Sequence, residues 1–344
     1  MARPSALSCR TDAPGGLPMS LVFRLVAWLA AAAFAAGPAH SQTFPSRSIT
    51  IVVPYPAGGP TDAAARFVGQ HMAATLGQNV VIENVSGGGA NIGSARVARA
   101  TPDGHTLLLH NLNIASNVSL YTNLPFDTEK DLIGLALVNY QPFVVVGRKD
   151  LPANSMAELA AWMKQNGPKV KFGHVGAGSL PHLIGAMLAK SVGVEFNMIP
   201  YRGATPALID LVAGHADVYV GTPASSGELI RTGQIKGYVV TAKERVAALP
   251  NVPSAIELGY KDLDILFWQA VFVPAATPKA VMARLNEALQ LALADPKVRK
   301  SFEDTGSSVY SKHEQTPEAT ATLLRSEIKR WGEVIRANKI TLSQ

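Results

Sequence analysis

The chain has 344 residues, of which 47% are hydrophobic and 16% are charged, and its formal net charge is +6. This balance excludes an intrinsically disordered protein, and the length predicts two domains at about 150 residues per domain. Cys9 is the one cysteine in the sequence, which excludes a disulfide framework and a cysteine metal site.

Residues 1–41 have the pattern of a secretory signal peptide. Arg24 precedes an apolar run over residues 25–36, and Ala39 and Ser41 provide small residues for a cleavage site after Ser41. The run is shorter than the roughly twenty residues that cross a bilayer, although an uncleaved membrane anchor is the alternative. Met19 is an alternative start. We therefore expect an exported protein whose mature chain begins at Gln42.

The mature chain carries a net charge of +4, because residues 1–41 contain three arginines and one aspartate. Its basic residues are interspersed with acids and form no block of five, which argues against a nucleic-acid partner. The mild positive charge favours an anionic small ligand.

Short apolar runs alternate with helical patterns along the mature chain. The predicted strands cover residues 49–53, 80–83, 106–109, 170–173, 196–199, 218–220 and 237–241. The predicted helices cover residues 62–76, 93–100, 181–192 and 205–213, and further helices begin at Ser155, Thr277-Pro278 and Thr316-Pro317. This alternation predicts an α/β fold in which each domain is a mainly parallel sheet flanked by helices.

Two apolar runs, 143–146 and 265–273, are placed to cross between the domains. The first domain would then consist of residues 42–145 plus 270–344, and the second of residues 146–269. A discontinuous domain with two hinge strands is the plan of a clamshell binding protein.

The loop over residues 54–62 is the first candidate binding site. It joins a predicted strand to a predicted helix, where the first backbone N–H groups lack intrahelical partners and attract an anion. The alternative is an ordinary turn capped by Thr61. No Gly-Lys-Ser/Thr follows, which excludes a nucleotide P-loop. The candidate ligand-binding residues are Tyr55, Ala57, Gly58, Gly59, Thr61 and Asp62.

A second loop with the same character follows the strand over residues 170–173. Its candidates are Gly176, Ala177, Gly178, Ser179 and His182, with Ser179 as the expected N-cap. A nucleophilic serine is the alternative, but Ala177 and Pro181 stand where a Gly-x-Ser-x-Gly elbow needs glycine. Two such helix starts in two domains predict a carboxylate held between them by backbone amides.

The remaining motifs argue against a cofactor or metal site and give further candidate ligand-binding residues. The cluster Gly87-Gly88-Gly89 does not fit Gly-x-Gly-x-x-Gly, so no dinucleotide cofactor is expected, and the histidine spacing predicts no metal site. Polar and aromatic side chains at or just past predicted strand ends are further candidates, because open α/β sheets bind ligands there. They are Asn111, Asn113, Tyr201, Thr222, Ser225 and Trp268.

Several segments together resemble one protein family. They read SRSITIVVPYPAGGPTD at 46–62, VIEN at 81–84, GANIG at 89–93, ATPDGHTLL at 100–108, PYRGATPAL at 200–208 and VPAATP at 273–278. In this order they resemble the substrate-binding proteins of tripartite tricarboxylate transporters, the Bug family. The resemblance runs from about Phe44 to the C-terminus.

The resemblance implies a type II periplasmic-binding-protein clamshell that binds a small carboxylate and delivers it to membrane transporter subunits. It implies no enzymatic activity and no cofactor, and we expect a monomer. A periplasmic sensor for a signalling receptor is one alternative, and a secreted serine hydrolase using Ser179 is another. Many family members have an aspartate near Gly221-Thr222 and a polar residue at Ile114. Their absence here disfavours an amino-acid ligand and favours a plain or aromatic carboxylate, with Trp268 and Phe267 as an apolar wall.

Overall fold

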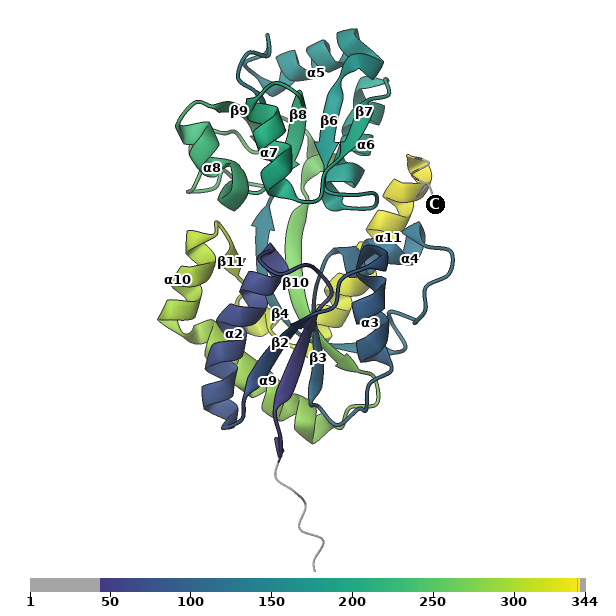
Figure 1. The fold of residues 1–344 in the computed structure, drawn as a ribbon, viewed down its shortest axis with the longest axis vertical. Coiled ribbons are helices and arrows are strands. Elements are labelled where there is room, and N and C mark those ends of the chain that lie inside the picture. The colour runs from purple at the N-terminus through teal and green to yellow at the C-terminus, as the bar shows by residue number, and fades with distance from the viewer. Residues whose placement is uncertain (1–43, 339, 341–344) are drawn as a thin grey trace, which may run out of the picture. The chain divides into compact units, whose positions relative to one another are not determined.

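The computed structural model describes residues 44–338 and 340, which form two β-sheets flanked by helices (Figure 1). We call the six-stranded sheet with its helices the first lobe, and the five-stranded sheet with its helices the second lobe. This arrangement confirms the predicted α/β class with two sheets. The predicted signal peptide lies outside the described residues.

The first lobe is built on a sheet with the strand order β11-β4-β10-β3-β1-β2. Its strands are β1 (Ile49–Val53), β2 (Val80–Asn84), β3 (Thr106–Asn111), β4 (Leu132–Pro142), β10 (Leu266–Pro274) and β11 (Ser308–Val309). Its helices are α2 (Pro60–Leu76), α3 (Asn91–Ala98), α4 (Asn113–Leu120), α9 (Lys279–Ala294), α10 (Pro296–Asp304) and α11 (Pro317–Ala337), with a 3-10 turn η1 (Gly88–Ala90) before α3 and another, η4 (Lys312–Glu314), before α11.

Helices cover both faces of this sheet. Alternate strand residues such as Ile51, Leu109 and Val271 pack with α2, α9 and α10 on one face, which we call the α2 face. Their neighbours, such as Leu108 and Phe272, pack with α3, α4 and α11 on the other face. The alternation follows from the two-residue period of a strand, and it determines which side chains point toward the start of α2.

The second lobe is built on a sheet with the order β7-β6-β8-β5-β9. Its strands are β5 (Val144–Arg148), β6 (Lys171–His174), β7 (Asn197–Pro200), β8 (Val218–Gly221) and β9 (Ile235–Val240). Its helices are α5 (Met156–Asn166), α6 (Leu180–Val192), α7 (Ala204–Val212) and α8 (Pro223–Arg231), and 3-10 turns lie at η2 (Gly167–Lys169) and, ahead of β10, at η3 (Lys261–Leu263).

The sheets are mixed rather than mainly parallel. The β1–β2, β1–β3, β6–β7 and β6–β8 pairs are parallel, as predicted from the βαβ pattern. The strands next to the crossings (β4, β5, β9 and β10) pair antiparallel with their neighbours. The reason is that β5 and β10, by which the chain enters each sheet from the other, run against the parallel strands of that sheet, whereas β4 and β9, by which it leaves, run with them.

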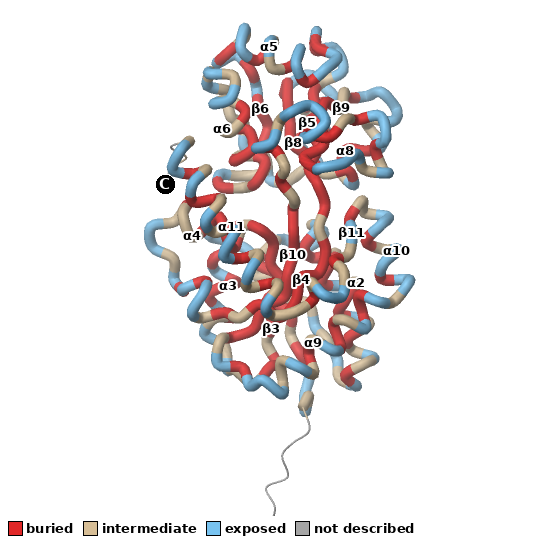
Figure 2. The backbone as a smooth tube through the Cα atoms, turned by 180° about the vertical axis from the view of Figure 1, so that it is seen from behind, coloured by how far each residue is buried: buried red, intermediate tan, exposed pale blue. Residues whose placement is uncertain are grey.

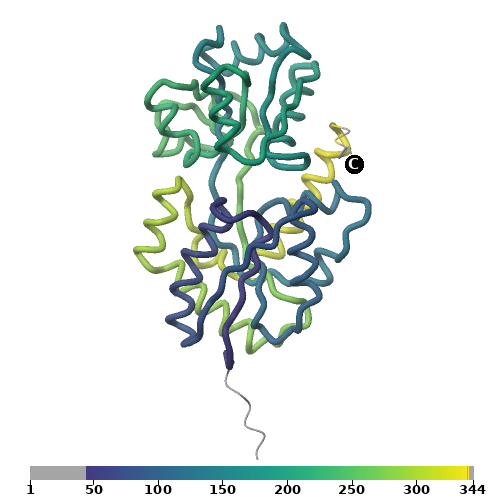
Figure 3. The backbone as a smooth tube through the Cα atoms, viewed as in Figure 1, coloured from purple at the N-terminus to yellow at the C-terminus, as the bar shows by residue number. Residues whose placement is uncertain are grey.

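The two crossings lie side by side, as the chain trace in Figure 3 shows. In one, β4 ends at Pro142 and β5 begins at Val144; in the other, the chain passes from β9 to β10. Thr241 joins them, because its hydroxyl accepts the Phe143 N–H at 2.8 Å and donates to the Ile265 carbonyl at 2.6 Å. The crossings therefore form one hydrogen-bonded unit.

The strands that meet at the crossings, β4, β5 and β10, are buried along most of their length (Figure 2). Thr241 itself is fully buried, and the Phe143 and Phe267 rings meet edge to face at 5.9 Å. Within residues 44–338 and 340, no helix has both the length and the apolarity to cross a membrane.

The hydroxyl of Thr241 gives a first prediction. Thr241→Val keeps the shape of the side chain but leaves the buried Phe143 N–H and Ile265 carbonyl without this partner. We expect the free energy of unfolding to fall by about 2 kcal/mol. Thr241→Ser retains the hydroxyl and should cost about 1 kcal/mol or less through the lost methyl group. Urea denaturation measures both values, and equal losses in the two variants would contradict the role of the hydroxyl.

Candidate ligand-binding site

The loop between β1 and α2 is held by polar side chains on both sides. The Tyr55 hydroxyl donates to Asn111 Oδ1 at 2.8 Å, and Asn111 Nδ2 donates to Thr61 Oγ1 at 3.2 Å. The N-cap of α2 is Gly59, so Thr61 is not the cap, and no side chain caps this helix. Burial raises the pKa of Tyr55, so its hydroxyl stays protonated as a donor.

The carboxylate of Asp62 supports this loop and is engaged by protein donors. Its carboxylate accepts hydrogen bonds from the Gly58 amide at 3.0 Å, from Arg66 at 2.9 Å and from Asn84 at 3.0 Å. Burial alone would raise the pKa of Asp62, but these donors lower it, so the group is a carboxylate. The carboxylate therefore holds Gly58, whose φ of 83° is left-handed, in place, and the backbone amide is the part of Asp62 that remains for a ligand contact.

Free amides remain at the start of α2. The first intrahelical bond runs from the Ala63 amide to the Gly59 carbonyl, so the amides of Thr61 and Asp62 have no partner within the helix. Side chains cap the starts of α5, α8, α10 and α11, whereas α2, like α3, α4, α7 and α9, has no side-chain cap among the described residues. The positive end of the α2 dipole thus carries donors that an anion can accept.

The loop between β6 and α6 has a comparable helix start in the second lobe. Ser179 is the N-cap residue, as predicted, but its hydroxyl donates to the Gly176 carbonyl at 2.7 Å and does not cap the helix. The first intrahelical bond joins the Leu183 amide to the Ser179 carbonyl, which leaves the Leu180 amide without a helical partner.

Two histidines shape this second loop. Nδ1 of His174 accepts the Gly176 amide at 3.2 Å, and Nδ1 of His182 accepts the Gly178 amide at 3.1 Å. Their rings lie 4.8 Å apart. Burial, with a smaller effect of His174, lowers the pKa of His182 to about 4, and burial also lowers the pKa of His174. Both rings are neutral at pH 7 and fix the loop as acceptors.

The same contacts bear on the serine-nucleophile alternative. A nucleophilic serine donates its hydroxyl proton to a base, as in a Ser-His pair. Here the Ser179 hydroxyl donates to a carbonyl, and Nδ1 of His182 is occupied by a backbone amide. These contacts give both groups structural roles within the loop.

The two loops approach each other across the lobes. Asn113, the first residue of α4, donates its own amide to Asn111 Oδ1 at 2.9 Å and its side-chain amide to the Gly178 carbonyl at 3.3 Å. Asn113 therefore links the first-lobe cluster of Tyr55, Thr61 and Asn111 to the glycine loop of the second lobe.

Three residues of the second lobe that were predicted to contact the ligand make side-chain hydrogen bonds within their own lobe. Thr222 and Ser225 form a capping box at the start of α8, with each side chain accepting a backbone amide of the other. The Tyr201 hydroxyl donates to Asp210 at 2.8 Å, and burial together with Asp210 raises the pKa of Tyr201 to about 12. These side chains order the loops before α7 and α8.

Trp268 is not available as an apolar wall. It is 2% exposed and lies on the sheet face opposite to Asn111, where its Nε1 donates to Glu327 on α11 at 3.3 Å. The prediction placed it correctly near a strand end but could not tell which face of β10 it occupies. The prediction that Trp268 forms an apolar wall of the site is therefore wrong, because Trp268 belongs to the core under α11.

Polar residues that were not predicted lie beside Asn111 on its own face. Gln269 of β10 pairs with Asn111 of β3 and with Asn139 of β4. Each of the three is no more than 4% exposed. A polar residue inside an otherwise apolar run is the sequence signal that could have identified Gln269 and Asn139.

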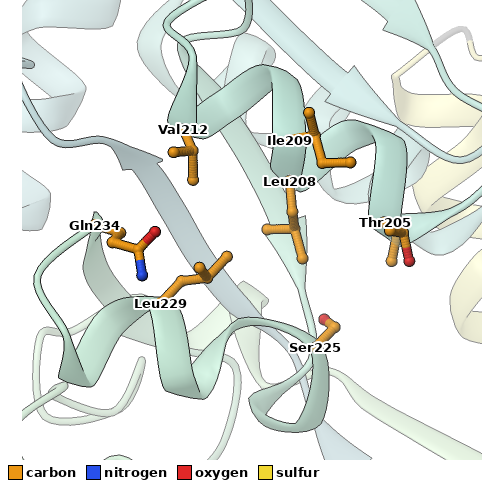
Figure 4. Close-up of a pocket in the computed structure, with 8 residues that line it drawn as sticks. Thr205, Leu208, Ile209, Val212, Ser225, Leu229 and Gln234 are labelled. Carbon is orange, nitrogen blue, oxygen red and sulfur yellow. The ribbon is translucent and has the colours of Figure 1, made fainter.

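A separate groove of ≈ 430 Å³ lies between α7 and α8 (Figure 4). The Leu208 and Leu229 side chains line it, and Ile209 at its edge is 62% exposed. Ser225 and Gln234 add polar atoms. Because its lining is largely aliphatic, this groove does not supply the converging amide donors that a carboxylate needs. Among the described residues, no three His, Cys, Asp or Glu side chains gather as a metal site would require.

Comparison with known proteins gives consistent matches. The family model described as the tripartite tricarboxylate transporter family receptor matches residues 64–340. An Agrobacterium vitis protein, the UPF0065 protein in the TAR-I ttuE-ttuC' intergenic region, is 37% identical over 313 residues, covering 91% of this chain and 90% of that protein.

Two solved structures are also similar. The periplasmic binding protein BugD matches with a TM-score of 0.79 at 36% identity, covering 87% of this chain and 99% of that one. MatC from Rhodopseudomonas palustris with bound malate matches with a TM-score of 0.78 at 35% identity, covering 85% of this chain and all of that one.

The neutral histidines of the second loop predict a pH dependence of stability. An unfolded chain protonates His182 near its ordinary pKa of 6.5, whereas the folded protein resists protonation down to about 4. Stability should therefore fall as the pH drops from 6.5 toward 4. In His182→Asn, where Oδ1 can accept the Gly178 amide, the difference in free energy of unfolding between pH 7 and pH 5 should be smaller. Urea titrations at both pH values test this, and an unchanged difference would contradict it.

Proposed function

The chain belongs to the tripartite tricarboxylate transporter receptor family, and from this premise we propose that it captures a small carboxylate between its lobes. The captured ligand would then pass to a membrane transporter of the tripartite tricarboxylate type. Its structural relatives are periplasmic solute-binding proteins rather than enzymes.

One observation carries the proposal. Two strand–helix loops, one in each lobe, present helix-start amides without intrahelical partners, and Asn113, which bonds to Asn111 beside the first loop, contacts the Gly178 carbonyl of the second loop at 3.3 Å. A carboxylate has two oxygens that can accept several N–H donors at once. A ligand that accepts from both loops would hold the lobes together, which ties recognition to closure. The contacts we propose are the amides of the loops at residues 57–62 and 176–182.

The ligand class follows from charges near the site. MatC holds malate, a dicarboxylate, which supports a carboxylate ligand for this chain. An amino acid would also need an acidic partner for its ammonium group. Asp217 does not serve as this acidic partner, because its carboxylate accepts hydrogen bonds from the Arg148 guanidinium at 2.8 Å and from the Lys171 amide at 2.9 Å. Ile114 is buried in the core. We therefore propose a carboxylate without an amine.

We further propose the limits of the lobes and the route of export. Because β5 begins at Val144 and β10 at Leu266, the predicted limits shift by a few residues: the first lobe would comprise residues 42–143 and 266–344, and the second residues 144–265, with the crossing strands as the hinge. The N-terminal segment would direct export, with cleavage after Ser41, and a monomer would suffice because both loops belong to one chain.

A ligand screen tests the proposal. Thermal unfolding of the chain from Gln42 would be measured with mono-, di- and tricarboxylates, aromatic acids and amino acids. A ligand at about one hundred times its dissociation constant adds about 2.7 kcal/mol, which raises the melting temperature by a few degrees. We expect such a shift with one class of carboxylate and none with amino acids.

Two controls make the result decisive. The ester of the active acid with every carboxyl group methylated should give no shift, because it lacks the charge that the helix-start amides recognise. The screen is repeated after refolding from denaturant, which removes a co-purified ligand. A flat response from the refolded protein would contradict carboxylate binding by the two loops.

A further inference from the structure

A row of buried carboxamides lies beside the start of α2. Gln269 of β10 stands directly opposite Asn111 of β3 on one side and Asn139 of β4 on the other. Residues that face each other on adjacent strands project to the same side of a sheet. All three therefore lie on the α2 face, one layer beyond the apolar residues Leu109 and Val271. We call Asn111, Gln269 and Asn139 the amide row.

The amide row begins at the proposed anion site. Asn111 accepts the Tyr55 hydroxyl and donates to Thr61, whose backbone amide is one of the free donors at the start of α2. Both polar atoms of the Asn111 side chain thus have partners within the protein. A carboxylate held by α2 would therefore lie next to the row.

The other end of the row leads to the second lobe. Val309 of β11 pairs with Asn139, and just before it the Ser307 hydroxyl donates to Gln141 Oε1 at 3.3 Å. Gly306 in the same turn packs against Pro223 at the start of α8, since a Cβ at Gly306 would lie 3.0 Å from the Pro223 Cβ. The row thus spans from α2 toward a contact between the lobes.

Gln269 and Asn139 have hydrogen-bonding groups without a partner in the part of the chain that the structure describes. Among the described residues, nothing pairs with Gln269 Oε1, Gln269 Nε2 or Asn139 Oδ1, and all three atoms are buried. Gln269 and Asn139 are each 1% exposed. A buried amide without a hydrogen-bond partner destabilises a fold. Because these amides lie beside a proposed binding site, a bound ligand is the partner that would satisfy them. The lobes touch at Asn113 and Gly178, so groups facing a ligand here would be shielded from solvent.

We propose that Gln269 and Asn139 form a subsite for an uncharged polar group, such as a hydroxyl, of the carboxylate ligand held at the start of α2. This inference rests on the proposed function. The chemistry fits because a carboxamide both donates and accepts, as a hydroxyl does. None of the atoms of the row carries a charge, so the subsite selects for hydrogen bonding and not for a second charge. Gln269 is thereby a specificity-determining residue.

The experiment compares acids that differ by one hydroxyl. Dissociation constants would be measured by calorimetry for succinate and malate, glutarate and 2-hydroxyglutarate, tricarballylate and citrate, and benzoate and 4-hydroxybenzoate. In the wild-type protein, the hydroxylated member of at least one pair should bind about tenfold more tightly. Gln269→Met should remove this preference and leave the affinity for the plain acid within about threefold.

Stability separates a ligand subsite from a structural role. Because Gln269→Met removes an unpartnered amide and keeps a similar volume, its melting temperature should equal or exceed that of the wild type. Asn139→Leu serves as a second variant with the same expected loss of preference. Gln290→Met is the matched control: Gln290 on α9 donates to the Gln315 carbonyl at 2.9 Å, and its loss should leave all ligand affinities unchanged.

The outcomes distinguish the subsite from the proposed function. Binding of carboxylates by the wild type with equal affinity within every pair would overturn the subsite and keep the function. An equal weakening of both members of a pair by Gln269→Met, together with a lower melting temperature, would also overturn it. If no acid of the panel binds, the proposed function fails and the subsite fails with it.

Discussion

The backbone amides at the first turn of a helix have no partner within that helix, and the structure leaves two such turns without a side-chain cap where the lobes meet. Side chains that could have capped them bond elsewhere: Thr61 Oγ1 accepts from Asn111, and the Ser179 hydroxyl donates to the Gly176 carbonyl. Asp62 and the two histidines of the second loop bind other loop amides and so fix the loop shapes. The donors that remain are preorganised for an anion, which lowers the entropic cost of binding it.

The hinge makes these two sets of donors depend on each other. The strands β4, β5 and β10 at the two crossings are buried, and the Thr241 hydroxyl joins the crossings. Such a joint allows the lobes to move as bodies while each loop keeps its internal hydrogen bonds. A ligand that accepts from both loops gains contacts only when the lobes are together, and its differential affinity for that arrangement sets how far the equilibrium shifts. The Asn113–Gly178 contact and the bond from Lys190 to the Ala337 carbonyl, at 2.6 Å, show where the lobes already meet.

Local sequence signals predicted much of this fold and little of its side-chain chemistry. The strand–glycine–helix pattern located both loops, because free helix-start amides are a property of the backbone. The engagement of the Asp62 carboxylate could not be predicted, because nothing in its neighbourhood of the sequence shows that Asn84, twenty-two residues away, bonds to it. The face of Trp268 depends on the register of β10 against β3 and β4, which includes a bulge, and pairing across strands cannot be read from one strand. The amide row was missed for the same reason, since its residues come from three strands far apart in the chain.

The most direct test of the account is hydrogen exchange at single backbone amides, followed by NMR with and without a saturating carboxylate. The account predicts that exchange slows at Thr61 in the first lobe and at Leu180 in the second, where the amides lack intrahelical partners. The amides of Gly58 and Gly178 should change little, because they already bond to Asp62 and His182. Slower exchange confined to one lobe, or absent from both helix starts while the ligand is bound, would contradict the claim that paired helix starts hold the anion.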